Sequence, residues 1–120
     1  TEEGKLIEVV EGMNYTGLKQ IPRISGFNDL KAAEELAGQY ASIPVTIRNA
    51  VSDIVYYPEK GYDERVALIL DDGKKLIVDI EDMKDTLSPS RFNYSAYMQS
   101  KRDICVFSFE GRNLYMTKCE

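Results

Sequence analysis

The sequence predicts an α+β protein, mainly β, whose centre is a five-stranded OB-fold-like barrel preceded by an N-terminal arm and a helix. Two observations carry this prediction. From residue 45 onward, apolar periodicity and turn residues follow the order strand, strand, strand, helix, strand, strand, which is the order of such a barrel. The chain has 120 residues, 43% of them hydrophobic, which is enough for one domain with a core.

The first 42 residues are predicted to form the arm and the helix. Residues 1–26 make the arm, with a short strand over Leu6–Val10 and a loop over residues 12–26, where Pro22 and three glycines break regular structure. Residues 27–42 contain a helix over about residues 29–40, with Asn28 or Asp29 as its N-cap. Its apolar residues recur close to one face: Leu30, Ala33, Leu36, Ala37 and Tyr40.

Residues 43–120 are predicted to form the barrel, which starts with a long bent strand and a hairpin. The strand covers Val45–Tyr57, and its alternation slips at Asn49 and Ala50, as at a β-bulge. The hairpin joins Val66–Leu70 to Leu76–Val78. Its Asp72-Gly73 pair favours a type I′ turn, and its continuous apolar runs indicate that both faces are covered.

The rest of the barrel is predicted as helical residues 81–101 and a second hairpin. The helical part is one broken helix or two short ones, with a second start at Ser88-Pro89. The hairpin joins residues 103–109 to 112–119 through a tight turn at Glu110-Gly111. In this register Cys105 and Cys119 are offset by about three residues across the hairpin, so a disulfide between them is not expected. Cys105 is interpreted as a small, buried apolar residue.

The composition argues against an enzyme. The chain has no His, which excludes Ser-His-Asp and Cys-His catalysis, His-bearing zinc sites and imidazole acid-base chemistry. Acidic residues cluster at positions 63–64, 71–72 and 79–85. Acidic residues are common in turns and at helix starts, which explains these clusters without a metal ion. The glycines form neither a phosphate-binding loop nor a dinucleotide motif. No enzyme activity, cofactor or metal is expected.

Tyrosines and cations remain as the candidate binding residues. Bases stack on aromatic rings while Lys and Arg follow the phosphates, a combination typical of single-strand binding. The net charge of −5 opposes a polyanion, but residues 88–118 contain five cations against two acids. Two stretches of the chain interleave aromatic residues with cations. The first holds Tyr56, Tyr57, Lys60, Tyr62 and Arg65, and the second holds Arg91, Phe92, Tyr94, Tyr97, Lys101 and Arg102. The predicted nucleic-acid-binding residues are Tyr56, Tyr57, Lys60, Tyr62, Arg65, Arg91, Tyr94, Arg112 and Tyr115.

The layout of residues 43–119 resembles that of the small, acidic OB-fold single-stranded-DNA-binding proteins of tailed phages. The resemblance rests on element order and turn chemistry: the 45–57 run, the 59–62 turn, the Asp-Gly hairpin, the helical 81–101 and the hairpin with Gly111. It implies a role in coating displaced strands during DNA replication, with Tyr56, Tyr57, Tyr62 and Tyr115 stacking bases and Lys60, Arg65, Arg91 and Arg112 contacting phosphates. The chain departs from many such proteins in ending without an acidic tail.

The predicted function is therefore non-enzymatic binding of single-stranded nucleic acid. The alternative is a protein-interaction module, or a small viral or bacterial inhibitor, whose acidic surface docks on a basic partner. Carbohydrate binding on the same tyrosines is a third interpretation. The edge strand over residues 112–119 offers a homodimer interface. Without a membrane-spanning run or a signal-peptide pattern, the expected location is the cytoplasm of a bacterium or of an infected host cell.

Overall fold

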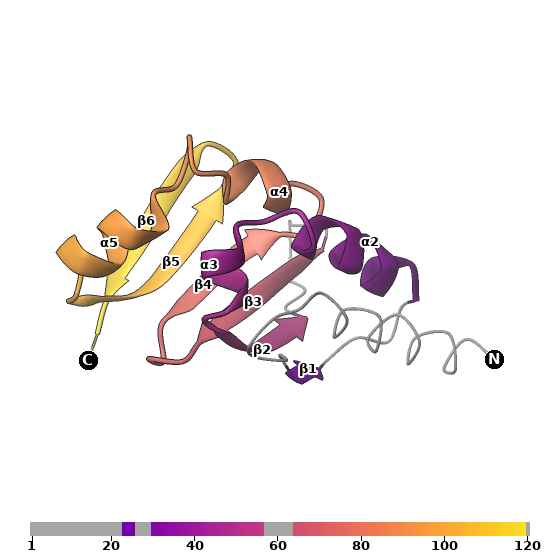
Figure 1. Ribbon diagram of the computed structural model, residues 1–120, viewed down its shortest axis with the longest axis horizontal. Helices are drawn as coiled ribbons and strands as arrows, with labels where there is room; N and C mark the ends of the chain where they lie inside the picture. The colour runs from indigo at the N-terminus through magenta and orange to yellow at the C-terminus, as the bar shows by residue number, and fades with distance from the viewer. Residues whose placement is uncertain (1–22, 26–29, 57–63, 120) are drawn as a thin grey trace.

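A computed structural model describes residues 23–25, 30–56 and 64–119, which form one mixed sheet and four helices (Figure 1). The strands are β1 (Arg23–Ser25), β2 (Val51–Tyr56), β3 (Arg65–Leu70), β4 (Lys75–Asp79), β5 (Ile104–Glu110) and β6 (Asn113–Lys118). The helices are α2 (Leu30–Tyr40), α3 (Val45–Arg48), α4 (Met83–Thr86) and α5 (Tyr94–Ser100).

The six strands lie in the sheet in the order of the sequence, from β1 to β6. The pairs β1–β2 and β4–β5 are parallel, and the other three pairs are antiparallel. Within the described residues β1 and β6 are the two edges of this sheet. The α+β prediction is confirmed, but the predicted barrel is wrong, because an open sheet takes the place of a closed one.

Two rows of side chains define the two faces of the sheet. Paired residues Leu68, Leu76, Phe107 and Met116 form one row, and Ala67, Ile77, Ser108 and Tyr115 form the other. Helices α2 to α5 lie over the first face, which we call the helix face (Figure 1). Burial of the apolar helix residues against this face supplies the hydrophobic core. Its helix-side members include Leu36, Tyr40, Ile43, Ile47, Met83, Leu87 and Phe92.

Several predicted elements are confirmed. Helix α2 covers Leu30–Tyr40, although its predicted caps, Asn28 and Asp29, lie outside the described residues. The β3–β4 hairpin forms as expected, and the 81–101 stretch contains two short helices. The second of these starts at Tyr94 rather than at Pro89, because the side chain of Asn93 caps it by accepting a hydrogen bond from Ala96 N–H.

The predicted strand over Val45–Tyr57 is wrong in its first half. Residues Val45–Arg48 form helix α3 after Pro44, and Ile47 is fully buried in the core. The slip at Asn49 therefore marks the end of a helix and not a bulge. The β-branched residues of this segment favour a strand locally, but burial of Ile47 against the sheet overrides that preference.

The arm and the first hairpin turn also differ from expectation. Residues 23–25, predicted as loop, form β1 beside β2, whereas the predicted strand over residues 6–10 lies outside the described part of the chain. The β3–β4 connection has three residues, since Leu70 N–H donates to the Lys74 carbonyl at 2.8 Å. Only Gly73 there has a positive φ, +89°, which excludes the type I′ turn and is typical of a three-residue loop with a glycine bulge.

Tyr40 gives the fold a measurable alkaline sensitivity. Burial raises the pKa of the Tyr40 hydroxyl far above its usual value of 10.0, while the Arg48 charge lowers it slightly. A raised pKa in the folded state means that the stabilisation is present below pH 10 and is lost as pH rises toward the folded-state pKa. We expect Tyr40→Phe to flatten the loss of thermal stability between pH 9.5 and 11.5. The half-buried Tyr97→Phe is the control, and equal slopes for Tyr40→Phe and the wild type would contradict the assignment.

Candidate functional site

The outer strand β6 is the most accessible regular element of the described sheet. Within the described residues it pairs with β5 alone, and all of its side chains except half-buried Leu114 are exposed. Tyr115 and Met116 are 54% and 42% exposed, which is high for large apolar side chains. An outer strand of this kind presents backbone donors and acceptors to a further strand.

The direction of the β6 backbone groups follows from one hydrogen bond. Cys119 N–H donates to the Asp103 carbonyl at 2.8 Å and so points toward β5. Backbone groups of a strand alternate in direction, so the N–H groups of Tyr115 and Thr117 also point toward β5. Those of Met116 and Lys118 point away from β5, to the open edge of the sheet.

The turn that begins β6 lies one residue later than predicted. Glu110 pairs with Asn113, so Gly111 and Arg112 form the two-residue turn and not Glu110 and Gly111. Gly111 has a φ of +61° at the first turn position, which is typical of a type II′ turn. The shift changes the register of the whole hairpin by two residues.

The corrected register brings the two cysteines together, so the prediction of no disulfide is wrong. A bulge at Cys105 falls between the pairs Ile104–Lys118 and Val106–Thr117. Cys105 and Cys119 form a disulfide with their Cα atoms 4.9 Å apart, within the usual range of about 4.4 to 6.8 Å. The bond joins β5 to the end of β6. The sequence held two signals for it: the cysteine pair itself, and Gly111, whose position in the turn sets the register.

The start of β5, unlike β6, is held by the rest of the fold. The buried Lys74 ammonium donates to the carbonyls of Arg102, at 3.2 Å, and of Ile104. Ile104 is itself buried, and Val106 pairs with Lys75 of β4. Cys105 therefore lies on a fixed strand.

Arg65 is completely buried and is therefore not a phosphate contact, contrary to prediction. Its guanidinium reaches across β4 to β5, where it donates to the Phe109 carbonyl at 2.9 Å and to Ser108 Oγ at 3.3 Å. It also lies 3.6 Å from Asp79 and 3.8 Å from Glu110. These contacts make Arg65 a structural link between three strands.

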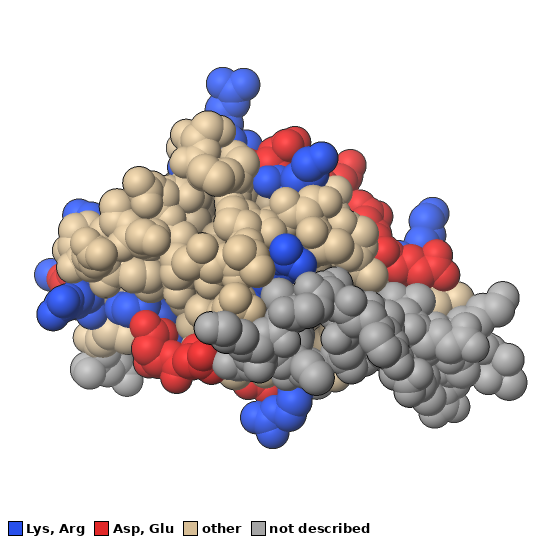
Figure 2. Space-filling view, in the orientation of Figure 1, with Lys and Arg blue, Asp and Glu red and all other residues tan. Residues whose placement is uncertain are grey.

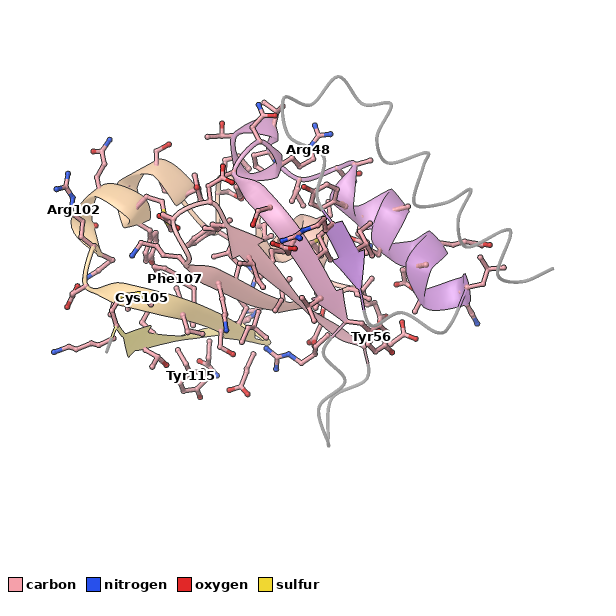
Figure 3. All side chains as sticks on the ribbon, turned by 90° about the horizontal axis from the view of Figure 1, so that it is seen from below. Arg48, Tyr56, Arg102, Cys105, Phe107 and Tyr115 are labelled. Carbon is pink, nitrogen blue, oxygen red and sulfur yellow. A yellow bond between two sulfur atoms is a disulfide. The ribbon has the colours of Figure 1, made fainter. Side chains whose placement is uncertain are left out.

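The remaining predicted site residues do not form one surface. Tyr94, half-buried, starts α5 on the helix face, whereas Tyr115 lies on the opposite face. Figure 3 shows Tyr56 on β2, well separated from Tyr115 on β6. Arg91 and Arg112 are exposed near the β5–β6 turn, and Arg91 donates to the Gly111 carbonyl at 3.5 Å. The other three lie outside the described residues: Tyr57, Lys60 and Tyr62.

The second predicted set is also divided between core and surface. Phe92 is buried, and its ring packs on those of Tyr97, Phe107 and Phe109. Lys101 and Arg102 are exposed. Figure 2 shows Lys and Arg at separate places around the rim of the helix-bearing side, close to Asp and Glu, rather than in one cationic strip.

Small hollows outside β6 show no catalytic arrangement. One of about 150 Å³ is lined by the carboxylates Glu35, Glu64, Asp79, Glu81 and Asp82. Another of about 200 Å³ lies beside Tyr94, Pro44 and Pro89. Burial, followed by the charges of Asp72 and Asp71, raises the pKa of the Tyr94 hydroxyl above its usual value of 10.0. Among the described residues, no group of three or more Cys, Asp or Glu is arranged to hold a metal ion.

Comparison with known proteins gives a consistent result. No family model matches the chain. It is 32% identical over 69 residues to a protein of Weissella koreensis and 33% identical over 87 residues to one of Geobacillus kaustophilus. These relatives are cell division proteins called DivIB. The matches cover 58% and 72% of this chain but only 24% and 33% of the relatives, so the chain spans a third or less of their length.

A solved structure agrees with the DivIB relatives. The chain is similar to the major extracytoplasmic domain of the cell division protein DivIB from Geobacillus stearothermophilus, with a TM-score of 0.55 and 28% identity. The similarity covers 70% of this chain and 68% of that domain.

These findings correct the functional interpretation of the sequence. The resemblance to phage single-stranded-DNA-binding proteins, with its replication role, is wrong, because the relatives and the solved structure are DivIB proteins. The predicted function, binding of single-stranded nucleic acid, is wrong for the same reason, and the alternative of a protein-interaction module fits these similarities better. The cytoplasmic location is wrong as well, since the matching solved structure is an extracytoplasmic domain. Within the described part of the chain, no helix is both long and apolar enough to cross a membrane.

Proposed function

We propose that this chain is the extracytoplasmic domain of a DivIB-type cell division protein and that it acts, without enzyme activity, as a docking domain for protein partners. The observation that carries the proposal is the similarity to the solved DivIB domain over about two thirds of both chains. The absence of His from the sequence and the lack of a catalytic arrangement in the described residues support a binding role.

The open edge of β6 is the proposed docking surface. The N–H groups of Met116 and Lys118 point outward, so an extended partner segment can continue the sheet through backbone hydrogen bonds. The exposed side chain of Tyr115, on the face opposite the helices, lies beside the added strand and supplies apolar contact.

Charge at the two ends of β6 distinguishes one kind of partner from another. Arg112 in the turn and Lys118 at the end of the strand are both exposed. In antiparallel self-pairing centred on Tyr115, Arg112 of one copy would face Lys118 of the other, and these like charges repel. A different protein, with acidic residues flanking an extended apolar segment, fits this edge better than a second copy does.

The backbone edge can be tested with two substitutions of the same residue. Met116→Pro removes an outward N–H while leaving the bonds to β5, whereas Met116→Ala keeps the N–H and removes the side chain. In the full-length protein within its own bacterium, with a photo-cross-linking residue in place of Tyr115, we expect a cross-link to another division protein. Met116→Pro should reduce its yield at least about tenfold, while Met116→Ala leaves it within about twofold.

Controls separate docking from folding. The far-ultraviolet circular dichroism and thermal midpoint of the purified domain should show that both Met116 variants are folded. Equal cross-linking by the folded Pro and Ala variants would exclude backbone docking at β6. Cross-links from the wild type that contain no division protein would exclude the proposed function itself.

A further inference from the structure

We propose that the Cys105–Cys119 disulfide is a redox latch that holds β6 in the register needed for docking, so that its reduction weakens partner binding. The inference rests on the proposed function of the β6 edge and adds a means of regulating it. It is drawn from the position of the bond in the hairpin and from the unequal support of the two strands.

The disulfide closes the hairpin at the end of β6 that lies away from the turn. At its beginning, β6 is joined to β5 through the Gly111-Arg112 turn. At its other end, Cys119 follows directly after the strand and is bonded to the bulged Cys105. Besides its backbone pairing with β5, the far end of β6 is held by the disulfide and by the Cys119 hydrogen bond to the Asp103 carbonyl.

Side-chain packing does little to fix β6. Leu114, close to the turn, is its one half-buried side chain, and the others are exposed. Strand register is strongly specified where one face is buried, and weakly specified where it is not. The half of β6 that carries the outward N–H groups of Met116 and Lys118 therefore depends on the disulfide more than on the core.

Cys105, by contrast, is on the fixed side of the bond. The Lys74 ammonium holds the backbone of Arg102 and Ile104, and the buried Ile104 side chain lies directly before Cys105. Figure 3 shows Cys105 on the same strand as Phe107, whose side chain is fully buried in the core. Reduction is thus expected to release β6 and to leave β5 in place.

The chemistry of the latch is thiol–disulfide exchange. Cys119 is exposed and Cys105 half-buried, so an incoming thiolate reaches the Cys119 sulfur first. The attack forms a mixed disulfide and releases the Cys105 thiolate, which takes up a proton. The reductant is a dithiol, and its second thiol then displaces the Cys119 sulfur from the mixed disulfide. Two thiols thus form on this chain, and one disulfide forms within the reductant. A disulfide-bearing oxidoreductase outside the cytoplasm reverses the reaction.

Amide hydrogen exchange of the purified domain tests the latch without a partner. We expect the amides of residues 115, 117 and 119, whose N–H groups point toward β5, to exchange at least about tenfold faster after reduction with dithiothreitol, and equally fast in Cys119→Ser without reductant. The β3 amides of residues 66–70 report on the core and should change less than about twofold. Unchanged exchange at residues 115, 117 and 119 would overturn the latch.

The cross-link from position 115 then links the latch to docking. We expect Cys119→Ser to lower its yield about tenfold, and a control, Ser100→Ala, to leave it unchanged. A full yield from Cys119→Ser would overturn the regulatory role even if exchange had changed. If the wild type forms no cross-link to a division protein, the proposed function is contradicted. The exchange result would still decide whether the disulfide restrains β6.

Discussion

Replacing Arg65 by Ala is expected to lower the free energy of unfolding by about 3 to 5 kcal/mol. The guanidinium is fully buried, lies near the carboxylates of Asp79 and Glu110, and donates to the Phe109 carbonyl. Its removal leaves a cavity between β3 and β5 and takes the positive charge away from two half-buried acids. Urea unfolding followed by circular dichroism measures the change.

Two further variants identify the cause of the Arg65 effect. Arg112→Ala removes an arginine from the exposed β5–β6 turn and should change stability by less than about 0.5 kcal/mol. Arg65→Met fills most of the volume without the charge. A small loss for Met but a large one for Ala would assign the effect to packing. A loss below about 1 kcal/mol for Arg65→Ala would contradict its role as a link between strands.

Replacing Phe92 by Ala is expected to cost about 3 to 5 kcal/mol as well. The ring is buried, with its centroid 4.9 Å from that of Tyr97 on α5 and 5.2 Å from that of Phe109 on β5. The substitution therefore removes ring contacts that join α5 to the sheet. Thermal unfolding monitored by calorimetry measures the loss.

Tyr115 provides the matched control for Phe92. Both residues belonged to the aromatic sets that the sequence indicated for binding, but Tyr115 is 54% exposed. Tyr115→Ala should change stability by less than about 0.5 kcal/mol, and Phe92→Leu should cost about 1.5 kcal/mol. Equal effects of the two Ala substitutions would show that exposure does not separate core from surface aromatics in this protein.

The elements that the sequence predicts correctly depend on local patterns. The face formed by Leu36 and Tyr40 indicates α2, and the apolar runs around Asp72-Gly73 indicate the β3–β4 hairpin. The open sheet depends instead on the parallel pairing of β4 with β5, which is not local. The apolar periodicity of a strand does not indicate which other strand it pairs with. The order of the elements alone therefore predicts a barrel, although the strands form an open sheet.

The candidate site was harder to predict for a related reason. Arginine is usually exposed at a protein surface, so the sequence alone indicates an exposed Arg65. The three-dimensional arrangement of β4 and β5 shows that it is buried. The proposed docking edge relies on backbone groups of Met116 and Lys118, whose side chains carry no signal of that role. The disulfide was missed because a shift of one turn residue, Gly111, changes every pair in the hairpin.

The order of the strands also makes the sheet a lateral spacer. β1 and β6 occupy opposite edges of the sheet that the described residues form, and neighbouring strands are about 4.8 Å apart, so these two strands are separated by about 20 to 25 Å. A strand added at Met116 would thus lie at that distance from β1. A partner that docks on β6, as proposed, is then kept apart from anything bound along β1, and the width of the sheet sets the gap between them.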